Sequence, residues 1–356
     1  MGRRDGRPEW AAGMGGRSGA RLVGHRGPAL GAEMPGVLRL VVVRAARSGG
    51  CAVIRAQRAD ESTSPDMTRT RLLLDVITPR RSHRYGTAHR CQTGELLLPR
   101  RRGPHPVVVT IHGGSWAAFY SKIVMRPIAA DLARRGWAVW NIEYRRVGRG
   151  QGGGWPATFL DVAAAIDHLR ELDAPLDLAH VTVLGHSAGG QLALWAAGRG
   201  ALPDGAPGAD PLVEPVAAIS QAGVNDLAQT YRESGGGAVG WLMGGSPDTY
   251  PDRYAIGDPI ERVPLAIPVL LVHCSDDRTV SVRRSRNYAL AAREAGGSVE
   301  LVELEGGEQA HRAHVNPDSE AWKCTASWLA QRRREWDLET ARREPEGVPV
   351  PQARRG

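Results

Sequence analysis

The chain has few cysteines and no long apolar segment near its start, and both absences narrow the classes of protein it can belong to. Its 356 residues include four cysteines, far apart at Cys51, Cys91, Cys274 and Cys324. They form neither a C-x-x-C pair nor a dense disulfide pattern, so we expect reduced thiols in a cytoplasmic protein. The apolar run at 37–43 is interrupted by an arginine and is too short to span a membrane. We expect neither membrane association nor an export signal.

Lysine is also scarce, because Lys122 and Lys323 are the only two and the remaining basic residues are arginines. The net charge of +8 raises the question of nucleic-acid binding. The two ends, residues 1–65 and 331–356, hold 18 of the 46 basic and 10 of the 38 acidic residues, which leaves 28 of each between them. The central part is formally neutral and its charges are dispersed along the chain, so we predict no nucleic-acid partner.

Composition divides the chain into three parts. Residues 1–65 are rich in Gly, Arg, Ser and Pro and show no sustained period of two or 3.6, so we predict a disordered extension, with Met67 a candidate for the true start. We expect a single catalytic domain over 66–332 and a disordered tail over 333–356.

The predicted domain alternates short apolar runs with longer helical patterns. Strands are expected at 107–111, 137–142, 181–184, 216–220, 268–273 and 299–304, and helices at 127–135, 156–172, 190–197, 283–295 and 318–332. Such alternation predicts an α/β fold, a mostly parallel central sheet covered by helices on both faces. The Gly-rich stretch 147–155 is expected to be a flexible connection or a rim of the site, and 203–214 and 233–259 to be long connections.

A G-x-S-x-G pattern stands where a hydrolase would need it. Residues 185–190 read GHSAGG and lie between the strand at 181–184 and a helix-compatible run. At such a turn the serine backbone is strained, and glycine at 185 and 189 leaves room for the chain to fold back. We predict Ser187 as a nucleophile; the alternative is a purely structural glycine turn.

A second glycine pair can supply the oxyanion hole of an acyl-transfer enzyme. The strand 107–111 leads directly into His112 and then Gly113, Gly114, Ser115 and Trp116. Amides in this segment, together with that of Ala188 after the nucleophile, are predicted to stabilise the oxyanion.

A base and an acid are expected later in the chain, in the order Ser, acid, His. Asp276 and Asp277 follow the strand 268–273, and His311 and His314 follow the strand 299–304. The order alone leaves either residue of each pair open. Elsewhere, we expect His112 and His186 to be structural, Glu143 to brace a strand end and Asp226 to cap a turn.

Four segments resemble a known family: HGGSW at 112–116, NIEYR at 141–145, WPATFLDVAAAIDHL at 155–169 and GHSAGGQLALW at 185–195. Over roughly residues 80–330 the chain resembles bacterial α/β-hydrolases related to kynurenine formamidases and small carboxylesterases. The resemblance implies the α/β-hydrolase fold and selects Asp277 as the acid, from a pattern like H-G-x-x-D-x-x-V-P, and His311 as the base, from its distance to Pro317. The chain departs from these patterns at Cys274, Ser281 and Asn316, and in the glycine spacing before His311.

We therefore expect a serine hydrolase without metal or cofactor that cleaves an ester or amide of a small carboxylic acid through acyl-Ser187. An arylformamidase is the nearest alternative, and a binding protein that keeps the fold without turnover is an alternative of another class. The sequence specifies neither the acyl group, nor the leaving group, nor the oligomeric state.

Overall fold

A computed structural model of the chain describes residue 70, residues 73–76 and residues 80–343. The extension predicted at 1–65, the suggested start at Met67 and the part of the predicted tail at 344–356 lie outside the described residues.

The described residues form one eight-stranded sheet in the order β1-β2-β4-β3-β5-β6-β7-β8. Its strands are β1 (Ser82–Arg84), β2 (Thr93–Leu97), β3 (His105–Ile111), β4 (Ala138–Ile142), β5 (Leu176–His186), β6 (Ala217–Gln221), β7 (Val269–Cys274) and β8 (Val299–Leu304). β3 to β8 are parallel, whereas β2 pairs antiparallel with β4 and β1 antiparallel with β2. All six predicted strands are confirmed, and the sheet is mostly parallel as expected.

The two antiparallel strands, β1 at the edge of the sheet and β2 beside it, were not predicted. β2 reads TGELL, and glycine and glutamate are depleted in strands. Gly94 lies here against the Trp140 ring, so close that a Cβ atom at this position would stand 2.4 Å from it. Tertiary packing against β4 therefore outweighs weak local propensity.

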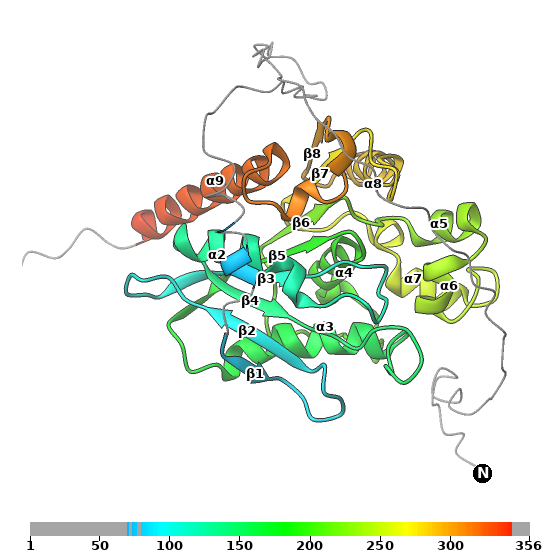
Figure 1. The fold of residues 1–356 in the computed structure, drawn as a ribbon, viewed down its shortest axis with the longest axis horizontal. Coiled ribbons are helices and arrows are strands. Elements are labelled where there is room, and N and C mark those ends of the chain that lie inside the picture. The colour runs from blue at the N-terminus through cyan, green and yellow to red at the C-terminus, as the bar shows by residue number, and fades with distance from the viewer. Residues whose placement is uncertain (1–69, 71–72, 77–79, 344–356) are drawn as a thin grey trace, which may run out of the picture. The chain divides into compact units, whose positions relative to one another are not determined.

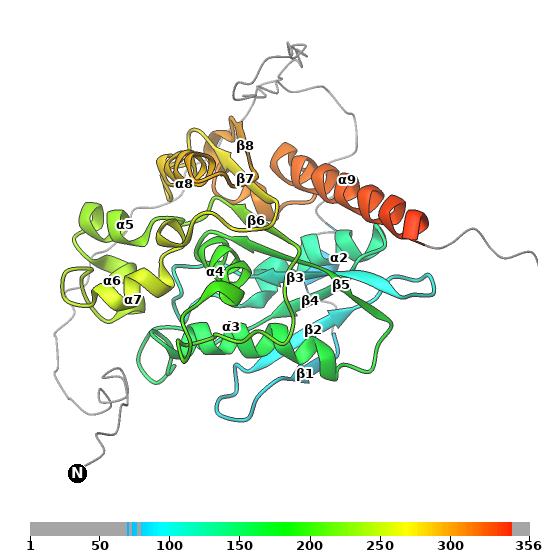
Figure 2. The same ribbon diagram turned by 180° about the vertical axis from the view of Figure 1, so that it is seen from behind.

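Helices cover both faces of the sheet (Figures 1 and 2). On one face α2 (Arg126–Arg134) and α9 (Glu320–Arg343) bury a core around Ile128, Trp322 and Leu329. On the other face α3 (Ala157–Asp167), α4 (Ala188–Ala197) and α8 (Arg283–Glu294) bury a second core. Short 3-10 turns occur at Lys122–Met125, His168–Glu171, Arg199–Ala201, Pro259–Arg262, Gly307–Gln309 and Ala313–Val315.

The last helix is longer than predicted. We expected it to end at Arg332, but α9 continues to Arg343, so the first part of the predicted disordered tail is helical. The reason is a tertiary contact: the Trp336 ring lies edge-on to Trp137, with centroids 6.0 Å apart, and stacks near His180 at 4.8 Å. Burying aromatic surface stabilises the extra turns.

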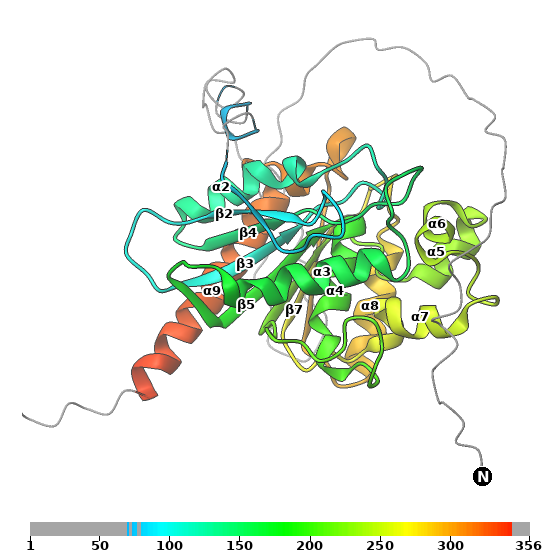
Figure 3. The same ribbon diagram turned by 90° about the horizontal axis from the view of Figure 1, so that it is seen from below.

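The expected long connection at 233–259 is instead largely helical. It contains α6 (Gly237–Met243) and α7 (Pro251–Gly257), which lie beside α5 (Leu227–Ser234) at one end of the sheet (Figure 3). Its many Gly and Asp residues bound short helices rather than a loop, because Gly235 and Gly244 end α5 and α6 in left-handed conformation. We call α5, α6 and α7 the cap. The stretches 147–155 and 203–214 contain no helix or strand, as predicted.

Two further properties concern the described part of the chain only. Its three cysteines, Cys91, Cys274 and Cys324, are free thiols. None of its helices combines the length and apolar character needed to cross a membrane.

Candidate active site

The predicted site residues lie just beyond the carboxyl ends of neighbouring parallel strands. Ser187 follows β5, the segment 112–116 follows β3, Asp277 follows β7 and His311 follows β8. In parallel sheets these ends meet at one edge, where ligands bind.

Ser187 has the strained backbone expected of a nucleophile elbow. Its φ of 56° and ψ of −121° form a conformation that side chains rarely adopt. Gly185 and Gly189 permit it, because a Cβ atom at 185 would stand 1.9 Å from the Gly189 carbonyl oxygen and one at 189 would stand 2.1 Å from that of Ile111. The amide of Ser187 donates to the Gln221 carbonyl at 2.8 Å. The turn is thus fixed between β3 and β6.

Asp277, the predicted acid, is held by several donors. Its Oδ2 accepts a hydrogen bond from Nδ1 of His311 at 2.7 Å, and its Oδ1 accepts from the amides of Thr279 and Val280 at 2.7 and 3.1 Å. Burial alone would raise its pKa, but hydrogen bonds from His273 and His311 and the charge of His311 hold the pKa well below its usual range. Asp277 therefore stays ionised beside His311.

His186 ties the loop of His311 to the turn that carries Ser187. Its Nε2 donates to the carbonyl oxygen of His311 at 2.7 Å, and the two rings are 4.7 Å apart. Burial, and then the charge of His311, lower the pKa of His186 to about 3, so this ring is neutral at physiological pH. We expected His186 to be only structural. Its hydrogen bond also connects two loops whose residues are 125 positions apart in the chain.

The two rival residues point elsewhere. The Asp276 carboxylate accepts from the amides of Gly306 and Gly307 at 2.9 and 2.7 Å, so it shapes the loop that leads to His311. His314 is fully buried, 3.8 Å from the Cys274 sulfur, and its Nδ1 has no hydrogen-bond partner among the described residues. The structure joins Asp277 to His311, the pair that the family pattern selects.

The segment 113–116 has the geometry of an anion-binding loop. Gly114, Ser115 and Trp116 have positive φ angles of 111°, 54° and 54°. Within the described residues, their amides donate to no protein acceptor, which leaves three donors in a row. Gly113 approaches the nucleophile so closely that a Cβ atom there would stand 2.8 Å from that of Ser187. Ala188, buried at the start of α4, completes the predicted set.

A buried polar cluster supports this loop, and we did not foresee its connections. Nε2 of His112 bonds Oε1 of Glu143 at 2.7 Å, and the Tyr144 hydroxyl donates to the His112 carbonyl at 2.8 Å. Burial would raise the pKa of Glu143, but the charge and hydrogen bond of His112 lower it. His112 follows β3, the segment NIEYR lies at the end of β4, and these two strands are paired in parallel. This arrangement is the signal that could have revealed the contact.

A second unforeseen link joins the loop to the cap. Nε1 of Trp116 donates to Oε1 of Gln191 at 3.1 Å, and Nε2 of Gln191 donates to the Gly257 carbonyl at 2.8 Å. Asp226 caps α5 as expected, accepting from the Gln229 amide at 2.9 Å. Asp258 accepts from the amides of Leu227 and Ala228, each at 2.8 Å, and so joins the end of α7 to the start of α5.

A pocket of about 370 Å³ opens between Ser187 and the cap. Its apolar wall includes Trp116, Val224, Val239 and Val280, and its polar wall includes Thr230, Glu233, Ser234, Arg278 and Arg284. Arg284 is buried and forms an ion pair with Glu233 of α5. Among the described residues, no three His, Cys, Asp or Glu side chains gather as a metal ion would require.

The sheet, its two helical layers and a serine on the turn between β5 and α4 define the chain as an α/β-hydrolase. It belongs to the BD-FAE family, whose model matches residues 95–291, more than half of the chain. The resemblance to esterases of the α/β-hydrolase superfamily is therefore confirmed.

The chain is similar to several individual proteins that are described as esterases. Esterase LipC of Mycobacterium tuberculosis is 28% identical over 218 residues; the match covers 57% of this chain and 52%, about half, of LipC. A truncated carbohydrate esterase from gut microbiota has a TM-score of 0.60 at 22% identity, covering 70% of this chain and 95% of that one. A butyrate-bound thermophilic esterase of Thermogutta terrifontis has a TM-score of 0.58 at 23% identity, covering 76% and 97%. At these identities the two structures indicate a shared fold.

Proposed function

We propose that the chain is a carboxylesterase that hydrolyses esters of short carboxylic acids through an acyl intermediate on Ser187. The observation that carries the proposal is the 2.7 Å hydrogen bond between Nδ1 of His311 and Asp277, next to a strained serine that lines a pocket. An aspartate bound to Nδ1 fixes the imidazole tautomer in which Nε2 is free to accept a proton.

Each step of the reaction then has a group to perform it. Ser187 Oγ attacks the ester carbonyl carbon while Nε2 of His311 takes its proton. Amides of the segment 113–116 and of Ala188 stabilise the oxyanion, each donor being worth about 3 kcal/mol of barrier. His311 returns the proton to the leaving alcohol as the ester C–O bond breaks. Water then attacks the acyl carbon with His311 again as base, and the bond to Ser187 Oγ breaks as Oγ takes back the proton and the carboxylic acid leaves. Asp277 stabilises the imidazolium in both steps.

The pocket supports a short acyl group. Its volume of about 370 Å³ is at the small end for ligand pockets. Trp116, Val224 and Val239 offer an apolar wall to an alkyl chain, whereas Arg284 and Glu233 offer a polar wall to the alcohol. Butyrate in the similar Thermogutta esterase and the carbohydrate esterase among the similar structures agree with a small acid and a polar alcohol.

The free thiols of the three described cysteines fit a reducing compartment and support a cytoplasmic location.

A substrate panel combined with an active-site probe tests the proposal. A fluorophosphonate should label wild type at Ser187 and leave Ser187→Ala unlabelled. Among p-nitrophenyl esters, kcat/KM should be highest for acetate to butyrate and fall for octanoate. Faster hydrolysis of N-formylkynurenine than of every ester would instead identify an arylformamidase. Absence of labelling would indicate a binding protein without turnover.

A further inference from the structure

A large basic groove lies at the end of the sheet opposite the candidate active site. It has a volume of about 1080 Å³ and is lined by the loop at 98–104 between β2 and β3, the end of α2 and the side of α9. This loop leads into the first residue of β3, whereas Gly113 stands two residues after its last residue. Because β3 has seven residues, the two sites are separated by about 20 Å.

Six arginines gather in this groove from three parts of the chain: Arg100, Arg101, Arg102, Arg134, Arg135 and Arg333. A run of three arginines, a pair and a single arginine, far apart in the sequence, are therefore close together in space. Asp337 is the only carboxylate among the described residues that line the groove. A neutral domain thus carries one strongly positive surface.

Carboxylates neutralise two of the six arginines and leave the other four without such a partner. Arg134 and Arg135 form ion pairs with Asp75 and Asp131. The other four have no ion pair with a carboxylate among the described residues; Arg333 donates only to the Gly136 carbonyl, at 2.8 Å. The positive charge of this set is available to a ligand.

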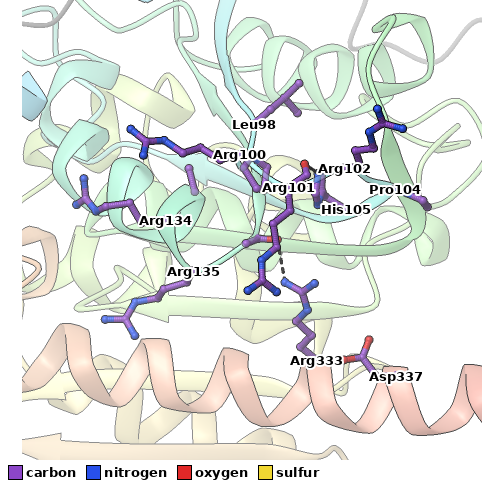
Figure 4. Close-up of a pocket in the computed structure, with 13 residues that line it drawn as sticks. Leu98, Arg100, Arg101, Arg102, Pro104, His105, Arg134, Arg135, Arg333 and Asp337 are labelled. Atoms are coloured by element: carbon purple, nitrogen blue, oxygen red, sulfur yellow. Dashed lines mark hydrogen bonds between the residues drawn. The ribbon is translucent and has the colours of Figure 1, made fainter.

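The backbone holds two of these side chains so that they converge. Nε2 of His105 bonds the carbonyl oxygen of Arg101 at 3.0 Å, and the His105 amide donates to the Pro175 carbonyl at 2.9 Å, which anchors the loop at 98–104. Arg333 lies over the Trp137 ring at 5.8 Å. Figure 4 shows the Arg101 and Arg333 guanidinium groups directed toward each other across the groove. Two like charges that face each other without an acid between them are stabilised by a bound anion.

We propose that this groove binds a compact anion that carries two or more phosphate groups. Phosphate offers several acceptor oxygens and up to two charges per group, and guanidinium is the side chain that matches it in bidentate geometry. The four arginines without a carboxylate partner carry four positive charges, and more than one phosphate group is needed to neutralise them. The positive charge is confined to one groove rather than spread as a stripe, which favours a compact ligand over a nucleic-acid duplex.

Calorimetric titration of the full chain with sodium tripolyphosphate, at low ionic strength, tests the proposal. The double variant Arg101→Gln/Arg333→Gln should bind about tenfold or more weakly than wild type. Arg334→Gln is the matched control, because Arg334 is exposed on the same helix but does not line the groove, and it should bind as wild type does. Ester hydrolysis should be unchanged in both variants, which verifies their folding independently of the groove.

Two outcomes would overturn the proposal. Equal affinity of the double variant and wild type would assign the binding to other arginines, for example the 11 in residues 1–65. Equal affinity for inorganic phosphate and tripolyphosphate would exclude a ligand with several phosphates. Sedimentation with phosphatidylcholine vesicles, with and without a phosphatidylinositol bisphosphate, identifies the source. Loss of vesicle binding in the double variant supports a lipid headgroup, and loss of tripolyphosphate binding alone supports a soluble anion.

Discussion

At the scale of single residues, the site depends on hydrogen bonds that join distant positions in the chain. Asp277 and His311 come from the loops after β7 and β8, and Ser187 comes from the turn after β5. Their individual contributions should therefore not be independent.

We predict that Asp277→Asn and His311→Ala each lower kcat by roughly 10³- to 10⁴-fold and that combining either with Ser187→Ala costs little more. The reason is that each residue acts only through the serine. Asp276→Asn is the control and should cost about tenfold or less, since its carboxylate bonds loop amides rather than the base. Steady-state kinetics with p-nitrophenyl butyrate measure these effects. Additive losses would contradict a shared mechanism.

His186 should act as a positioning residue. Replacing it by Phe removes the donor to the His311 carbonyl, and we expect kcat to fall by about 10- to 100-fold with little change in KM. His186→Gln places an amide donor near the position of Nε2 and should restore part of the rate. An unchanged kcat in the Phe variant would show that the bond does not position the base.

The sequence could predict the reacting residues because each stands in a local pattern after a strand. It could not predict how His112 contacts Glu143, or how His186 contacts His311, because those contacts depend on the strand order of the sheet. The neighbours of a catalytic group are a tertiary property.

At the scale of elements, the helices of the cap are a part of the fold that the sequence pattern did not predict. Its helices have seven or eight residues, which is too short for helical periodicity to be informative. They persist because Asp226 and Asp258 satisfy amides at the start of α5 and because Val239, Leu242 and Met243 are buried. Long strands of β-branched residues carry a much stronger local signal, and those were predicted.

Asp258→Ala should loosen the cap. The substitution removes the acceptor of the buried Leu227 amide and of the half-buried Ala228 amide, so we expect about 2 kcal/mol of destabilisation. The KM for short esters should rise, because the cap forms one side of the pocket. Asp252→Ala, at an exposed position in the first turn of α7, is the matched control and should leave both quantities nearly unchanged. Urea unfolding and steady-state kinetics at pH 7 compare the two variants; an unchanged KM in Asp258→Ala would separate the cap from substrate binding.

At the scale of the whole molecule, buried histidines link stability to pH. Burial, followed by the charges of neighbouring histidines, lowers the pKa of His314 well below 6.5, and His186 is lowered to about 3. Below pH 6.5 the unfolded chain therefore binds protons that the folded chain does not, so these two groups make stability fall as pH falls. Asp258 has the opposite sign, because burial raises its pKa to about 7 and folding takes up a proton.

Comparison of a variant with wild type isolates one group. We predict that His314→Phe flattens the fall in the free energy of unfolding between pH 6.5 and 5.5 by up to about 1 kcal/mol. Urea unfolding at the two pH values measures the difference. A variant whose slope equals that of wild type would show that His314 takes up a proton in the folded protein as readily as in the unfolded one.

Because β3 to β8 are parallel, the molecule has two distinct rims, a first one at the carboxyl ends of these strands and a second one at their amino ends. The loops that carry the predicted catalytic residues each leave a strand at its carboxyl end, whereas the loop at 98–104 and Gly136 lie where strands begin. An attachment at that second rim would hold the protein with its pocket facing solution. Immobilisation on a phosphate-bearing resin through the arginine groove should consequently retain turnover, while coupling through the cap should obstruct it.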